Sequence, residues 1–159
     1  MKILTRPLLV ALLLASGSSA IAIASAADCT PPPDAIVGLW DTHVTAGPCP
    51  AGPIVFRGRG LNVFHAGGTI SATNNLPPFA NGPTYGVWHS LGHGQYSVRM
   101  QFYRYLPDGT FDGIQDIRRT LLISADHQRT QETTFVRVLN PDDSLRTTLC
   151  GAATAQRVQ

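Results

Sequence analysis

Eight β-rich stretches, each bounded by turn-forming residues, constrain most strongly what this chain can fold into. They lie at 36–45, 54–65, 68–74, 84–91, 94–106, 110–124, 129–139 and 144–158. The connections between them are Gly, Pro, Asn and Asp clusters such as "AGG", "PDG" and "NPDD", which supply a positive φ or a preset φ. Beyond the N-terminal segment, no stretch longer than two turns shows the apolar period of a helix. The pattern predicts an all-β protein.

The fifth stretch shows the alternation of a half-buried strand most clearly. Tyr96, Val98, Met100 and Phe102 fall on one of its faces, and more polar residues fall on the other. Regularly spaced strands with short turns favour an up-and-down meander, and closing it into a barrel removes exposed edges. We therefore predict a single antiparallel up-and-down β-barrel of about eight strands, with an interior that is filled by side chains or holds one small ligand. The longest irregular segment, 75–83, is expected at the barrel mouth.

The N-terminal segment has the parts of a secretory signal peptide. Lys2 and Arg6 precede an apolar run, and "ASA" at 24–26 is an A-x-A-like cleavage site. The apolar run is shorter than the roughly 20 residues of a membrane span. We expect a signal peptide at 1–26, a Pro-rich leader at 27–35 and a single β-barrel domain at 36–159. The protein is accordingly expected to be secreted or periplasmic.

The charge balance gives no reason to expect a polyanionic partner. The sequence has 12 Lys and Arg against 10 Asp and Glu, and loss of the signal peptide removes Lys2 and Arg6, which leaves a formally neutral chain. The basic character of the precursor therefore does not carry over to the mature domain. We expect no nucleic-acid partner and no membrane span, and the oligomeric state stays open.

The three cysteines, Cys29, Cys49 and Cys150, allow three pairings in an oxidising compartment. We favour Cys49 with Cys150, because Cys49 follows the first strand, Cys150 lies in the last, and these strands are neighbours in a closed barrel. Closing a loop of about 100 residues is expected to stabilise the fold by about 4 kcal/mol. Cys29, in a Pro-rich leader, is then free or intermolecular.

The first strand carries a Gly-x-Trp, at Gly38 and Trp40, and the last strand ends near Arg157. If the two strands pair, the Arg157 guanidinium can lie over the Trp40 indole and cap nearby carbonyls, with a gain of about 1 kcal/mol or more. On these three residues the chain resembles the calycin, or lipocalin-like, barrels, which carry a Gly-x-Trp on the first strand and an arginine late in the last. The resemblance implies a small barrel closed at one end.

A longer pattern is similar to that of a group of small secreted bacterial proteins without an assigned function. The pattern is G-x-W…F-x-x-G-G-T…G-x-W…G-x-Y, and its residues here are Gly38, Trp40, Phe64, Gly67, Gly68, Thr69, Gly86, Trp88, Gly94 and Tyr96. This resemblance implies a fold and an extracytoplasmic location, and it implies no reaction.

Candidate metal ligands are His89 and His93, four residues apart in "HSLGH", with His65 as a distant third. In a helix this spacing would place two histidines on one face, but Gly92 and Gly94 oppose a helix. We expect exposed turn histidines, with no metal and no other cofactor.

Asp112, Asp116 and Glu132, which lie within strand-like stretches, are the candidate acid–base carboxylates. Two of them facing the barrel interior would suit acid–base chemistry. The alternative, which we favour, is pairing with arginines of neighbouring strands, for which the candidates are Arg118, Arg119 and Arg137. No serine has a nucleophile-elbow context, and we assign no catalytic residue.

Trp88, Tyr96, Met100 and Phe102 form an apolar stripe that is either ordinary core or the wall of a ligand pocket, since such pockets are mostly apolar. On the second interpretation, the protein binds a small, largely apolar molecule through these four residues. Two alternatives stay open. One is an enzyme that cyclises or isomerises a hydrophobic substrate, similar to allene oxide cyclase barrels, by positioning it and excluding water. The other is a non-catalytic structural or interaction module.

Overall fold

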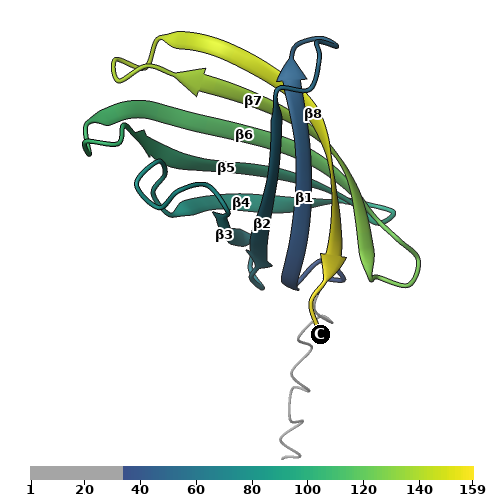
Figure 1. The fold of residues 1–159 in the computed structure, drawn as a ribbon. Helices are drawn as coiled ribbons and strands as arrows, with labels where there is room; N and C mark the ends of the chain where they lie inside the picture. The colour runs from purple at the N-terminus through teal and green to yellow at the C-terminus, as the bar shows by residue number, and fades with distance from the viewer. Residues whose placement is uncertain (1–33) are drawn as a thin grey trace, which may run out of the picture. The chain divides into compact units, whose positions relative to one another are not determined.

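The structure is a computed structural model that describes residues 34–159, so the expected signal peptide, most of the leader and Cys29 lie outside the described residues. Eight antiparallel strands each pair with the next, and the first pairs with the last (Figure 1). They are β1 (Gly38–Pro48), β2 (Phe56–Phe64), β3 (Thr69–Asn74), β4 (Thr84–Gly92), β5 (Gln95–Tyr105), β6 (Phe111–Ile123), β7 (Arg129–Leu139) and β8 (Leu145–Arg157). The predicted all-β, closed, up-and-down barrel is confirmed, and every predicted strand boundary lies within three residues of the observed one.

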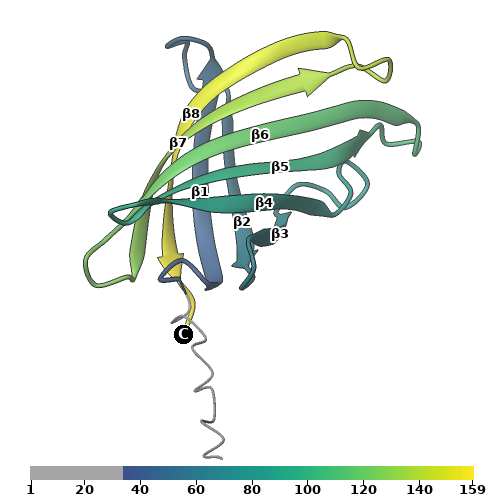
Figure 2. The ribbon, with the colours of Figure 1, turned by 180° about the vertical axis from the view of Figure 1, so that it is seen from behind.

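Glycines let neighbouring strands approach each other closely at two places in the barrel. A Cβ on Gly86 of β4 would lie 2.1 Å from the carbonyl oxygen of Arg99, and one on Gly151 of β8 would lie 2.0 Å from that of Thr45. No side chain fits at either distance. The curved wall formed by β4 to β7 is seen from behind in Figure 2.

Apolar side chains fill the end of the barrel where β1 begins and β8 ends. Trp88 packs edge-to-face against Phe64, with ring centroids 6.3 Å apart, and against Tyr96, with centroids 5.8 Å apart. Trp40 and Leu121 are buried beside this aromatic cluster. Aromatic pairs of this geometry add about 0.5–1.5 kcal/mol each to the burial of their surface. We call this the closed end.

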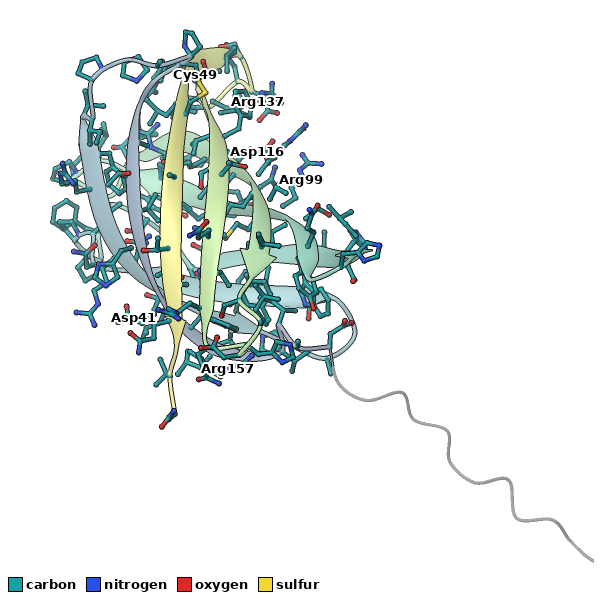
Figure 3. The ribbon with its side chains drawn as sticks, turned by 90° about the vertical axis from the view of Figure 1, so that its right-hand side faces the viewer. Asp41, Cys49, Arg99, Asp116, Arg137 and Arg157 are labelled. Carbon is teal, nitrogen blue, oxygen red and sulfur yellow. A yellow bond between two sulfur atoms is a disulfide. The ribbon has the colours of Figure 1, made fainter. Side chains whose placement is uncertain are left out.

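Arg157 lies across the closed end, with its Cζ 4.4 Å from the centroid of the Trp40 ring (Figure 3). Its guanidinium donates hydrogen bonds to the carbonyl oxygens of Val37, at 2.9 Å, of His127, at 2.9 Å, and of Ala35. Gly38 is needed because a Cβ there would lie 2.6 Å from Nη1 of Arg157, and because its φ is +134°. The Gly-x-Trp and the terminal arginine are therefore parts of one contact.

A disulfide joins Cys49, just after β1, to Cys150 in β8, with their Cα atoms 4.9 Å apart. The predicted pairing of these two cysteines is confirmed. The bond lies at the end of the barrel opposite Arg157, as Figure 3 shows. The β1–β8 seam is thus fastened at one end by the disulfide and at the other by the arginine.

Candidate functional site

A cavity of about 130 Å³ occupies the barrel interior on the disulfide side of the closed-end core. Its apolar wall comes from five strands and comprises Val44, Met100, Phe102, Ile117, Val136 and Leu149. The connections after β1, β3, β5 and β7 all lie at this end, which we call the mouth. Leu76, from the segment 75–83, also lines the cavity, so this segment contributes to the site.

Four polar residues are each the cavity-lining residue of their strand nearest the closed end, and we call these four the polar floor. They are Thr42 on β1, Asn62 on β2, Arg119 on β6 and Thr134 on β7. Asn62 donates a hydrogen bond from Nδ2 to Oγ1 of Thr42 at 2.7 Å, and both residues are buried. Buried polar side chains therefore lie on the closed-end side of the cavity's apolar wall.

An ion pair lies inside the barrel at this level. Arg119 Nη1 lies 3.3 Å from Oε2 of Glu132, and their side chains are only 8% and 1% exposed. The second oxygen of Glu132 accepts a hydrogen bond from the hydroxyl of Thr130 at 2.9 Å. Buried charges need such partners because their desolvation is costly. Both oxygens of Glu132 are thus engaged within the protein.

Arg119 and Thr134 line the cavity although neither was predicted to do so. Alternation in β6 contains the signal, since Arg119 stands two residues after Ile117 and two before Leu121, both of which are buried. Thr134 shares the face of Val136 in the same way. Strand alternation therefore places both side chains inside the barrel, provided that polar residues are accepted at interior positions.

The predicted apolar stripe of β4 and β5 is divided between two places. Met100 and Phe102 line the cavity. Trp88 and Tyr96 lie in the aromatic cluster of the closed end and are not among the cavity-lining residues. The indole Nε1 of Trp88 donates to the carbonyl oxygen of His65 at 3.1 Å, which fixes the ring in this core. Two of the four predicted residues therefore reach the space where a ligand would lie.

The three candidate acid–base carboxylates lie with different arginines. Glu132 pairs with Arg119 inside the barrel. Asp116 is buried on the outer wall beneath Arg99, at 3.2 Å, and Arg137, at 3.9 Å (Figure 3). These two carboxylates are therefore paired with arginines of neighbouring strands, which is the alternative that we favoured.

Asp112, the third carboxylate, joins three strands at the mouth. Arg146 of β8 donates to its two oxygens at 2.9 and 3.1 Å, and Arg104 of β5 lies 2.6 Å away. The hydrogen bonds from Arg146 and the charge of Arg104 hold the pKa of Asp112 below its ordinary value, although burial acts in the opposite direction. The ionised carboxylate is therefore favoured in the folded protein.

We expect Asp112→Asn to lower the melting midpoint at pH 7 by roughly 2–4 °C, and to do so less at acidic pH. The folded pKa lies below the unfolded value of about 3.9, so the carboxylate stabilises the fold above that pH and loses this effect as the pH falls through the folded pKa. Thermal unfolding by circular dichroism from pH 3 to pH 7 measures the difference. A gap between wild type and variant that stays constant to pH 3 contradicts it.

The candidate metal ligands do not form a site in the described part of the chain. His93 adopts a φ of 51° in the turn between β4 and β5, flanked by Gly92 and Gly94. Within residues 34–159, no group of three or more His, Cys, Asp or Glu side chains is placed to hold a metal ion.

Comparison with known proteins yields no match to a family model, a curated protein or a solved structure. The closed barrel of eight antiparallel strands fits a lipocalin-like fold. Over residues 34–159, the structure contains no helix of the length and apolarity needed to cross a membrane.

Proposed function

We propose that this protein is a secreted, calycin-like barrel that binds one small, largely apolar molecule in the cavity between mouth and polar floor. The observation that carries the proposal is the cavity itself, about 130 Å³ with an apolar wall and a few polar groups at one end. Ligand sites typically have this composition. An engineered apolar cavity of roughly 150 Å³ holds benzene, so the ligand expected here has a single ring or an equivalent size.

Two features favour binding over the alternatives. Glu132 faces inward, but Arg119 and Thr130 engage both of its oxygens, which supports a structural role for this carboxylate rather than proton transfer. The interior also retains space beside Met100 and Phe102, whereas a purely structural barrel is expected to be filled. The disulfide supports an oxidising compartment, as the expected signal peptide does.

The methyl group of Met100 provides a direct probe of the cavity. The sequence has two methionines, Met1 and Met100, so methyl-labelled methionine gives one signal from the cavity wall. We expect titration with toluene to shift this signal in a saturable manner. Native mass spectrometry of protein never denatured tests for a resident ligand as a stoichiometric adduct that organic extraction removes. A Met100 signal unmoved by toluene and by the extracted material contradicts the proposal.

Filling the cavity should abolish binding without unfolding the barrel. Ala72 of β3 lines the cavity, and Ala72→Leu is expected to weaken toluene binding at least about tenfold, while stability stays within about 1 kcal/mol of wild type. Ala152→Leu is the matched control, because Ala152 is exposed on β8 and does not line the cavity. Toluene affinity that is equal in both variants places the binding elsewhere.

A further inference from the structure

Two polar atoms of the floor are buried without a partner in the protein. They are Nε of Arg119 and Oγ1 of Thr134. The two residues stand directly opposite each other in the β6–β7 pairing, and both line the cavity. Cross-strand neighbours on one face have Cβ atoms about 4.5–5.5 Å apart, so one ligand atom can lie within reach of both side chains. Buried polar groups without partners are costly and rare in native proteins.

The other polar groups at this level are paired, which sets these two atoms apart. Thr42 accepts from Asn62, and the hydroxyl of Thr130 donates to Glu132. Arg119 uses Nη1 for Glu132 and keeps its Nε–H unused. An Nε–H can only donate, and a threonine hydroxyl can donate as well. The atom that satisfies both is therefore an acceptor.

The charges of the lining indicate that this acceptor is uncharged. Glu132 already balances Arg119, and Arg59, the other charged lining residue, is held by both oxygens of Asp41. A carboxylate entering the cavity would bring a charge without a counterion into a buried site, which is strongly unfavourable. A carbonyl oxygen is neutral and has two lone pairs, one for each donor.

We propose that the cavity recognises an uncharged carbonyl compound of single-ring size, whose oxygen accepts hydrogen bonds from Arg119 and Thr134 while its apolar body lies against Met100 and Phe102. The inference rests on the proposed function and specifies the chemical class of the ligand. On this proposal Thr134 is a binding residue. Its unpartnered hydroxyl destabilises the free protein and strengthens binding of the ligand.

Three probes of nearly the same shape test the proposal: acetophenone, α-methylstyrene and benzoate. The first has a neutral carbonyl, the second a carbon–carbon double bond in its place, and the third a carboxylate. If desolvation alone decided affinity, an apolar cavity would bind α-methylstyrene more tightly than acetophenone, because the acetophenone carbonyl loses its hydrogen bonds to water. We expect acetophenone to bind at least as tightly as α-methylstyrene and at least about tenfold more tightly than benzoate at pH 7, as measured by titration of the Met100 methyl signal.

Thr134→Val and Thr130→Val are matched variants with opposite expected signatures. Thr134→Val removes an unpartnered hydroxyl and should raise the melting midpoint, yet weaken acetophenone binding about three- to tenfold without weakening α-methylstyrene binding. Thr130→Val removes a hydroxyl that serves Glu132 and lies outside the cavity lining. It should lower the melting midpoint and leave the ratio of the two affinities unchanged.

The outcomes separate this inference from the proposed function. If α-methylstyrene binds in the cavity but Thr134→Val leaves the affinity ratio unchanged, the barrel binds ligands and the carbonyl assignment is overturned. Benzoate as the tightest of the three ligands also overturns it. If none of the three shifts the Met100 signal, the proposed function fails for molecules of this size, and the inference falls with it.

Discussion

Replacing both Cys49 and Cys150 with alanine is expected to lower the free energy of unfolding by about 4 kcal/mol. The bond closes a loop spanning a sequence separation of 101, which contains nearly the whole barrel, so its loss greatly enlarges the conformational freedom of the unfolded chain. Urea unfolding followed by tryptophan fluorescence measures the change. Domains of this size are stable by about 5–15 kcal/mol, so the loss is a large fraction of the total stability.

Reduction of the wild-type protein is the control for the alanine substitutions, because it breaks the disulfide but keeps both cysteine side chains in place. The reduced protein and the double alanine variant should unfold at similar urea concentrations, both well below that of the oxidised protein. Neither cysteine lines the cavity, so the folded fraction of each form should bind toluene with wild-type affinity. Equal unfolding midpoints for oxidised and reduced protein mean that the bond does not stabilise this barrel.

The fold follows from the sequence because its determinants are local. Turn residues such as the "PDG" and "NPDD" clusters mark where strands end, and alternation within a strand marks its two faces. Strands joined by short turns usually pair with their neighbours in the chain. The closing β1–β8 pair is non-local, and the predictions of the Cys49–Cys150 bond and of the Trp40–Arg157 contact both depended on it.

The sequence predicts the candidate site less completely than the fold. Alternation shows whether a side chain points into the barrel, but it does not show how far along the barrel axis that side chain lies. Trp88 and Met100 both point inward, yet Trp88 lies in the closed end and Met100 at the cavity. Depth depends on how far each strand is shifted against its neighbours, which the pairing of distant residues decides. The interior position of Arg119 is not evident from local sequence. A buried arginine needs a partner such as Glu132 on the adjoining strand, and the strand register that brings the two together depends on residues distant in the chain.

We expect Arg157→Ala to lower the free energy of unfolding by about 3 kcal/mol. The substitution removes the guanidinium from the Trp40 ring and leaves the carbonyl oxygens of Val37 and Ala35 without their donor. Arg157→Lys should recover less than half of the loss, because an ammonium lacks the planar fork that spans several carbonyls. Urea unfolding of the three proteins measures both effects, and an unchanged midpoint for Arg157→Ala contradicts them.

A double-mutant cycle with Gly38→Ala tests why glycine precedes the tryptophan. Two causes act at Gly38: its φ of +134°, which disfavours any side chain, and the 2.6 Å approach of Arg157 Nη1 to the position of a Cβ. The first cause persists when Arg157 is replaced, and the second disappears. We therefore expect Gly38→Ala to cost less stability in the Arg157→Ala background than in wild type, by about 1 kcal/mol. An equal cost in both backgrounds means that backbone conformation alone requires the glycine, and that the Gly-x-Trp and the arginine are energetically independent.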